Sequence, residues 1–181
     1  MPENYIGIMC GTSLDSLDLS LCDFEKNKKI KYFKSYRIRQ SLRDKINECK
    51  NHPNRKKLFS ETDALTTEFI INSVRKFITA SKTKKIAAIG YPGITIIHNP
   101  KKKISKTLGN PAIIAKESGL RVVADFRLTD MKHGGQGAPL APYFHDYISS
   151  KGRSFLNFIN LGGFANLTYR SGNKLMAFDT G

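Results

Sequence analysis

The chain has 181 residues, 40% of them hydrophobic, and its 30 Lys and Arg against 15 Asp and Glu give a formal net charge of +15. Domains typically hold about 100–200 residues, so this length predicts one domain, or one domain and part of a second. The hydrophobic content excludes a wholly disordered chain. No apolar run reaches the roughly 18–20 residues of a membrane helix, and the N-terminus lacks the basic and apolar regions of a secretory signal. We therefore expect a cytoplasmic protein with no membrane partner.

The cysteines point to the same compartment. Cys10, Cys22 and Cys49 are odd in number and widely spaced, without a Cys-x-x-Cys pair or a Cys/His cluster. Disulfide frameworks and zinc sites need paired or clustered ligands. We predict three free thiols in a reducing compartment.

Positive charge gathers between residues 26 and 57, where Lys and Arg outnumber the two acids, Asp44 and Glu48, and again at 101–106. Clustered Lys and Arg bind nucleic-acid phosphates, but neither cluster lies in a known RNA- or DNA-reading motif. Much of the first cluster alternates with apolar residues, as on a solvated face. We favour a solvated surface, with nucleic-acid binding and attraction of an anionic small molecule as the alternatives.

Three strands are predicted in the first 40 residues. An apolar run at 5–10 ends in Gly11-Thr12-Ser13, and apolar residues alternate with polar ones from Leu17 to Phe24. A third apolar run covers 31–38. Alternation of period two, interrupted by short turns, is typical of antiparallel strands.

Helical spacing follows. Ser41 is a candidate cap for a short helix to about Lys50, and apolar residues recur every three or four positions over 58–80, which predicts a long amphipathic helix. Buried strands are predicted at 86–90 and 94–98.

The alternation of helix and strand then continues. Asn110-Pro111 marks the start of a helix and Gly119 its end, because Asn caps helices, proline suits the first turn and glycine the C-terminus. A strand at 120–124, a glycine-rich loop at 134–137 and a helix at 139–148 come next. This order predicts an α/β fold in which helices pack on the faces of a central sheet.

The last 30 residues repeat the opening order of strand, turn, returning strand, turn and third strand. The elements are a strand at 155–161, the turn Gly162-Gly163, and strands at 164–169 and 174–178. An internal duplication is a fold-level signal. We predict a first lobe at 1–150 and the opening β-segment of an incomplete second lobe at 151–181.

One candidate ligand site is the segment from Gly11 to Asp18, which directly follows an apolar strand. Glycine allows the backbone to approach a phosphate, and Thr12 and Ser13 offer hydroxyl and N–H groups to its oxygens. Asp15 and Asp18 could hold Mg²⁺. No Gly-Lys-Ser/Thr is present, so this is not a Walker loop, and a polar hairpin turn is the alternative.

A second candidate is Asp179, in the closing Asp179-Thr180-Gly181. A carboxylate at a strand end, facing a cleft between two duplicated lobes, is placed to take a proton from an attacking oxygen. We expect Thr12 and Asp179 to line opposite walls of one crevice. Pepsin-like proteases also carry Asp-Thr-Gly, but they need two copies. A turn-forming Asp is the other alternative.

A third candidate is the polar segment that holds Asp125, Arg127 and Asp130. Arg can bind a carboxylate or phosphate with two hydrogen bonds, and Asp can accept them from sugar hydroxyls. Loops after strands commonly hold ligands in α/β folds. A structural Asp–Arg pair inside the loop is the alternative, and His98 and His145 are predicted to be structural.

Five motifs, in order and across almost the whole chain, resemble those of the anhydro-N-acetylmuramic acid kinases, which are sugar kinases of the actin-like (ribonuclease H-like) ATPase fold. They are Ile8–Asp15, Leu108–Ala112, Val123–Arg127 with Gly134–Leu140, Asn160–Thr168 and Phe178–Gly181. The resemblance implies an actin-like lobe with a mixed central sheet and flanking helices, followed by the first strands of a second lobe. It covers about the first half of the family's length.

The resemblance also implies a reaction that uses ATP and Mg²⁺. Water opens the 1,6-anhydro ring of anhydro-N-acetylmuramic acid while O6 takes the γ-phosphate, which gives N-acetylmuramic acid 6-phosphate and ADP in cell-wall recycling. Such catalysis depends on positioning and electrostatics. By the resemblance, Asp179 is the general base, and Asp125, Arg127 and Asp130 form a wall on the sugar side. The residues implied to contact the ATP phosphates are Gly11, Thr12, Ser13, Leu14, Asp15, Ser16, Leu17 and Asp18.

The sequence departs from the family's pattern in two ways, in its motifs and in its length. Tyr91-Pro92-Gly93-Ile94 stands where the family usually has His-Gly-Gln-Thr, and Ser16 stands where it has Gly. The family also continues beyond Gly181 into a lobe that carries the adenine pocket. We therefore expect little or no turnover and poor solubility from this chain alone, unless a homodimer or a separately encoded second lobe completes it. The alternative is an inactive remnant or split half that acts as an interaction module.

Overall fold

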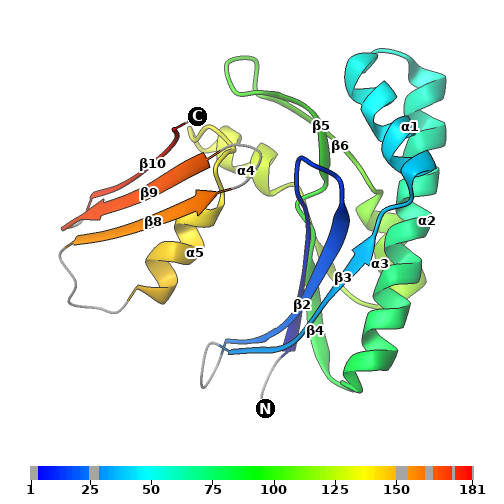
Figure 1. Cartoon of the computed structure of the whole chain (residues 1–181), viewed down its shortest axis with the longest axis horizontal. Helices are drawn as coiled ribbons and strands as arrows, with labels where there is room; N and C mark the ends of the chain where they lie inside the picture. Colours follow the sequence, from blue (N-terminus) through cyan, green and yellow to red (C-terminus); the bar gives the residue numbers. More distant parts are fainter. Residues whose placement is uncertain (1–3, 25–28, 150–154, 162–164, 173, 181) are drawn as a thin grey trace.

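A mixed five-stranded sheet forms the centre of the first part of the molecule (Figure 1). The computed structural model describes residues 4–24, 29–149, 155–161, 165–172 and 174–180. The strand order is β3-β2-β1-β4-β7, in which β1, β2 and β3 are antiparallel and β4 and β7 run parallel to β1. The strands are β1 (Asn4–Cys10), β2 (Ser16–Asp23), β3 (Lys29–Arg37), β4 (Ile86–Gly90) and β7 (Val122–Val123). The predicted α/β fold with a mixed central sheet is confirmed.

One face of this sheet is covered by helices. The helices of this layer are α1 (Gln40–Asn51), α2 (Lys56–Ser81) and α3 (Pro111–Ser118). Leu17, Leu19 and Leu21 alternate along β2 and are at most 2% exposed, and they share one core with Val74 and Phe77 of α2, which are fully buried. Burying side chains of this size contributes about 1.5–3 kcal/mol each. Period-two alternation on the strand and helical spacing on α2 thus meet in one core, as the sequence predicts.

Local signals placed both ends of α3 correctly. The Asn110 side chain accepts hydrogen bonds from the N–H groups of Ala112 and Ile113, and Gly119 ends α3 in the left-handed region at φ 68°. The predicted Ser41 cap is wrong, because α1 begins one residue earlier and Arg39 stands at its cap position without a side-chain bond.

Two elements were not predicted. β6 (Ile104–Leu108) pairs antiparallel with β5 (Ile94–Asn99) as a separate two-stranded sheet. α4 (Phe126–Lys132) occupies the segment that was predicted to be a polar loop. The predicted strand at 120–124 is present as the two residues of β7.

A second sheet stands beside the first and is joined to it through α5 (Ala141–Ile148) (Figure 1). Its order is β10-β9-β8, antiparallel throughout, which repeats the arrangement of β1 to β3. The strands are β8 (Phe155–Leu161), β9 (Ala165–Ser171) and β10 (Lys174–Asp179). The predicted Gly162-Gly163 turn and the predicted lobe boundary at 150 lie outside the described residues. Among the described residues, no helix is both long and apolar enough to cross a membrane.

Contacts from α5 to β8 and β9 hold the second sheet. A hydrogen bond of 2.8 Å joins His145 Nδ1 to Thr168 Oγ1, and the His145 ring stacks on Phe158 with 4.2 Å between centroids. Arg170 reaches Asp146 at 3.1 Å. His145 is therefore structural, as predicted.

Candidate functional site

The turn between β1 and β2 presents the predicted phosphate-binding residues. The Leu14 N–H donates to the Gly11 carbonyl oxygen at 3.1 Å, which closes a tight turn with Thr12 and Ser13 exposed at its tip. Leu14 is 1% exposed and packs in a small core with Ile38. The base of the turn is thus packed in the core, while Thr12 and Ser13 at its tip remain accessible to a ligand.

The backbone of the turn explains one departure from the family's pattern. Leu14 lies in the left-handed region at φ 58°, a conformation that costs an ordinary residue roughly 1–2 kcal/mol. Ser16 is not among the positive-φ residues. A glycine is therefore not required at position 16, and Ser16 donates instead to Asp18 Oδ1 at 2.8 Å.

Not all eight residues of the segment from Gly11 to Asp18 can present side chains to a ligand. Leu14 and Leu17 are buried, so their side chains belong to the core. Gly11, Thr12, Ser13 and Asp15 are exposed, while Ser16 and Asp18 are half-buried. Contacts to a phosphate from this turn would come from its backbone N–H groups and from the Thr12 and Ser13 hydroxyls.

Arg43 of α1 is a residue of this turn that sequence reasoning missed. Its guanidinium lies 3.1 Å from Asp15 Oδ1 and donates to the Ser13 carbonyl oxygen at 3.4 Å. The Ile38 N–H, at the end of β3, donates to the Asp15 carbonyl oxygen at 3.0 Å. Arg43, which lies 30 residues after Ser13 in the chain, thus stabilises the part of the turn that carries Asp15.

The carboxylates of this turn are compatible with Mg²⁺, which takes one or two carboxylates and completes its shell with water and phosphate oxygens. Asp15 and Asp18 supply that number, and the Asp15 side chain is 68% exposed. Among the described residues, no group of three or more His, Cys, Asp or Glu could hold a metal without phosphate. Burial raises the pKa of Cys10, next to the turn, to about 11, which favours the protonated thiol. Cys10, Cys22 and Cys49 are free thiols, as predicted.

The three predicted sugar-binding residues around α4 differ in their contacts. The side chains of Arg127 and Asp130 are hydrogen-bonded within the protein, whereas that of Asp125 is exposed. Arg127 donates to the Gly137 carbonyl oxygen at 2.8 Å, and the Gly137 N–H donates to Asp130 Oδ2 at 2.7 Å. These two side chains therefore shape the glycine loop. Asp125, in the left-handed region at φ 58°, is exposed and its carboxylate has no partner among the described residues.

The hydrogen bonds of Asp130 favour its ionised form. Tyr143 donates to Oδ1 at 2.7 Å, and this bond, followed by the one from the Gly137 N–H, lowers the pKa of Asp130. Burial lowers the pKa of Arg127. His98 contacts the same loop through the Gln136 carbonyl oxygen at 2.9 Å, so it is structural, as predicted.

A buried network fixes the loop between β6 and α3. The Tyr91 hydroxyl donates to the Leu108 carbonyl oxygen at 2.7 Å, and the Gly109 N–H donates to Asp63 Oδ1 at 2.7 Å. Gly109 has φ 91°, and a Cβ there would collide with the Tyr91 hydroxyl. Burial raises the pKa of both Tyr91 and Asp63. Tyr91, which stands where the family usually has His, is therefore a core residue.

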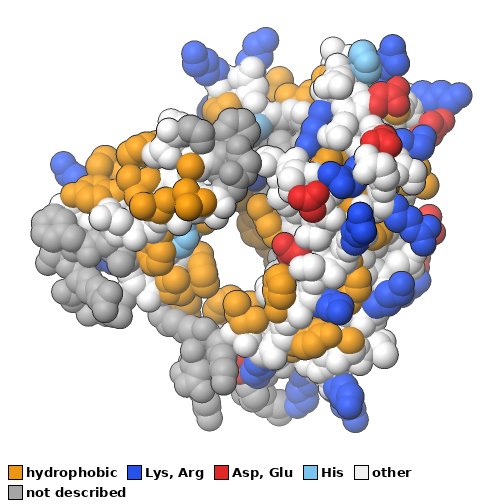
Figure 2. Space-filling view, in the orientation of Figure 1, with side chains coloured by type: hydrophobic (Ala, Val, Ile, Leu, Met, Phe, Trp, Pro, Cys, Tyr) orange, Lys and Arg blue, Asp and Glu red, His pale blue; other side chains and the backbone are white. Residues whose placement is uncertain are grey.

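The side chain of Asp179 lies outside the described part of the structure. Its backbone pairs with Asn166 at the end of β10, and the Thr180 N–H continues the ladder to the Ala165 carbonyl oxygen at 2.8 Å. Figure 2 shows an open gap between the second sheet and the first. That Thr12 and Asp179 line opposite walls of one crevice stays a prediction.

Comparison with known proteins identifies the family. A family model described as anhydro-N-acetylmuramic acid kinase matches residues 3–181. Curated relatives with that name include those of Sulfurimonas denitrificans (38% identical over 100% of this chain and 50% of the relative), Sulfurovum sp. (38%, 99% and 51%) and Pseudomonas putida (34%, 98% and 50%). The chain spans about half the length of the curated relatives it matches.

A solved structure of a ROK family transcriptional regulator, a homologue of the E. coli MLC protein, is similar at a TM-score of 0.46 with 12% sequence identity, over 97% of this chain and 38% of its own. A likeness of that size decides neither fold nor function. The family match, by contrast, extends over almost every residue and includes the β1–β2 turn. The chain belongs to the anhydro-N-acetylmuramic acid kinase family.

Proposed function

We propose that this chain forms the phosphate- and sugar-binding part of an ATP-dependent kinase that converts 1,6-anhydro-N-acetylmuramic acid, ATP and water to N-acetylmuramic acid 6-phosphate and ADP. The observation that carries the proposal is the β1–β2 turn. Its tip exposes Thr12 and Ser13 while buried Leu14 fixes its base, in a chain that the kinase family model matches from residue 3 to 181. Such a turn suits a phosphate, because short hydroxyl side chains and backbone N–H groups face outward together.

Each part of the proposed site has a role. The residues from Gly11 to Asp18 hold the ATP phosphates, and Asp15 and Asp18 would hold Mg²⁺, which neutralises phosphate charge when it is bound. Asp179 accepts the proton of the water that attacks the anomeric carbon. Asp125 accepts hydrogen bonds from sugar hydroxyls, while Arg127 and Asp130 position the adjacent glycine loop.

The proposed enzyme works in the cytoplasm as part of a larger assembly. Residues 1–150 would be its first lobe and 151–181 the opening of a second. The second sheet exposes large apolar side chains, with Ile159 at 69%, Leu161 at 83% and Phe178 at 49%. Apolar surface of this kind favours a covering partner. Either the polypeptide that corresponds to the other half of the relatives or a second copy of this chain would supply the cover.

Recombining halves tests the proposal. The purified chain is mixed with ATP, Mg²⁺ and 1,6-anhydro-N-acetylmuramic acid, alone and together with the other half of the Sulfurimonas denitrificans relative. We expect N-acetylmuramic acid 6-phosphate and ADP in equal amounts only from the combined halves. Asp179→Asn should lower the rate about 10²–10⁴-fold without weakening ATP binding. Asp44→Asn, on the exposed face of α1, is the control and should leave both the rate and ATP binding unchanged.

Two results would contradict the proposal. One is a combined complex that binds both substrates and forms no product. The other is an ATP titration in which the amide resonances of Gly11, Thr12 and Ser13 do not move. Full turnover by the chain alone would instead overturn the expectation that a partner is needed.

The exposed second sheet also favours a second candidate function, as an interaction module without turnover. In that case the chain would bind its covering partner through Ile159 and Leu161, and product would be absent from every combination. Ile159→Ser with Leu161→Ser would then abolish complex formation measured by size-exclusion chromatography.

A further inference from the structure

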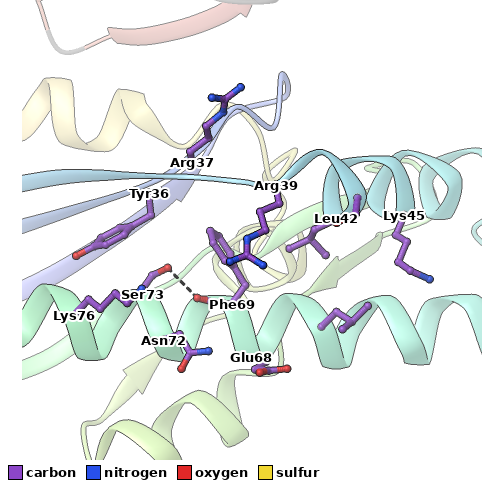
Figure 3. A pocket seen from close by; sticks show the side chains of 12 residues that line it. Tyr36, Arg37, Arg39, Leu42, Lys45, Glu68, Phe69, Asn72, Ser73 and Lys76 are labelled. Carbon is purple, nitrogen blue, oxygen red and sulfur yellow. Dashed lines mark hydrogen bonds between the residues drawn. The ribbon is translucent and has the colours of Figure 1, made fainter.

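The first observation is a cavity on the helix-covered side of the first sheet (Figure 3). It measures about 580 Å³ and is formed by the end of β3, the first turns of α1 and the middle of α2. Small-molecule sites typically measure about 300–1,000 Å³. None of its lining residues belongs to the turn from Gly11 to Asp18.

Unpaired positive charge is the second observation. Arg39, Lys45 and Lys76 line the cavity, and none of them has an ion-pair partner among the described residues. Glu68 is the acid among the lining residues, and within the described structure it pairs with none of them. The basic side chains of the lining outnumber this acid, and a cavity with an excess of one sign of charge concentrates counter-ions.

Some neighbouring cations on the same elements have ion-pair partners. Arg43 of α1 pairs with Asp15, Arg75 of α2 with Glu117, and Lys31 of β3 with Asp23. Lys34, Lys50, Lys56 and Lys57 lie on the same elements outside the cavity and also have no ion-pair partner among the described residues. The cavity is therefore distinguished by the gathering of Arg39, Lys45 and Lys76 in one hollow.

The third observation is an apolar surface beneath the charges. Figure 3 shows the Arg39 guanidinium directed from the start of α1 toward Phe69 on α2. Leu65, also in the lining, is 42% exposed. A planar guanidinium both binds phosphate with two hydrogen bonds and stacks on rings, so the cavity offers charge and apolar contact to one ligand.

The start of α1 adds to the positive character of the cavity. Its first turn carries no acidic residue, and its cap position has no side-chain bond. The N–H groups of Leu42 and Arg43 donate to the Arg39 carbonyl oxygen, while those of Gln40 and Ser41 have no partner among the described residues. Ser41 and Asn72 contribute polar side chains to the same lining.

We propose that this cavity binds a small organic phosphate with an aromatic or apolar portion, held by Arg39, Lys45 and Lys76 over Phe69 and Leu65. Arg39 and Lys45, in the basic stretch from residue 26 to 57, thus contact a specific ligand rather than only solvent. The site is separate from the proposed ATP site and does not depend on it.

Phenyl phosphate, which joins a ring to a phosphate dianion, is the probe. It is titrated into the ¹⁵N-labelled chain at low ionic strength, with inorganic phosphate and phenol as comparison ligands. We expect saturable shifts at Ser41, Leu42, Asn72 and Ser73, and a Kd at least about threefold lower for phenyl phosphate than for inorganic phosphate.

Matched variants separate the site from general charge. Arg39→Gln with Lys45→Gln should raise the Kd for phenyl phosphate at least about tenfold. Lys101→Gln with Lys102→Gln removes the same charge from the exposed turn between β5 and β6 and should change it less than about twofold. All four side chains are at least partly exposed, so both variants are expected to fold, and circular dichroism checks this.

Three outcomes would overturn the proposal as a whole, and a fourth would overturn its apolar part. They are equal weakening by both variant pairs, shifts confined to residues 11–18, and binding of a single-stranded oligonucleotide by a chain that ignores phenyl phosphate. The last would assign the basic stretch to nucleic acid. Equal affinity for inorganic phosphate and phenyl phosphate would remove the apolar part of the ligand.

Discussion

The two antiparallel meanders of this molecule share a topology and differ in what covers them. β1 to β3 bury a full row of leucines against α2, whereas β8 to β10 leave Ile159, Leu161 and Phe178 exposed beside α5 alone. Figure 2 shows the contrast as orange side chains over the second sheet and abundant blue ones over the first part. Three strands alone do not make a stable layer; an apolar cover does. Stability should therefore reside in the first part.

Truncating the first core should have the largest effect. Phe77→Ala removes a fully buried ring from α2 and should lower the free energy of unfolding by about 3–5 kcal/mol. Leu161→Ala, on the second sheet, should change it by less than about 0.5 kcal/mol, because that side chain is 83% exposed. Urea unfolding followed by circular dichroism measures both. Similar losses in the two variants would refute the contrast.

Two glycine substitutions should change the free energy of unfolding by less than Phe77→Ala does. Gly109→Ala places a methyl group against the Tyr91 hydroxyl at φ 91°, and we expect a loss of about 2–3 kcal/mol. Gly172, in the second sheet, has φ 54° with open space around it, so Gly172→Ala should cost about 1 kcal/mol. The same urea experiment ranks them, and the reverse order would show that the Tyr91 network is not rigid.

Acidification should loosen the second sheet first and produce the smallest effect. Burial lowers the pKa of His145, so its neutral form stabilises the contact with Thr168. Because the folded pKa lies below the unfolded value of about 6.5, this stability is present above that pH and is lost as pH falls through the folded pKa. Hydrogen-exchange protection of β9 should fall between about pH 7 and 5, relative to β2.

A His145→Gln variant provides the control for acidification, because it keeps polar atoms at that position but does not titrate in this range. Protection of its β9 should not vary with pH relative to β2. A parallel fall in β2 of the unaltered chain would mean that a different group, acting on the whole fold, is responsible.

Much of the fold follows from local patterns in the sequence. Asn110 and Gly119 bound α3 because each supplies a cap that needs only neighbouring residues. β6 was missed because only its end residues, Ile104 and Leu108, are apolar, and its pairing with β5 depends on the three-dimensional fold. α4 was missed because a single buried residue, Met131, marks its inner face.

The candidate site was predictable in its tip and not in its supports. Thr12 and Ser13 come just after an apolar run that predicts a strand, so the sequence alone indicates their position. Arg43 approaches Asp15 across the start of α1, and Asp63 receives the Gly109 N–H from 46 residues away. Such long-range partners leave no local signal. Leu14 at positive φ carries none either, because leucine rarely adopts that conformation.

The outermost strand β3 has a further consequence for handling the protein. One of its edges faces no neighbour within its sheet, and Ile30 and Phe33 are more than half exposed there, so two molecules could join strand to strand. Exposed Lys34 and Arg37 on the same strand repel such a pairing. Their reach shrinks from about 10 Å in 0.1 M salt to about 3 Å in 1 M. Concentrated salt, which is often added to keep basic proteins in solution, should here promote aggregation.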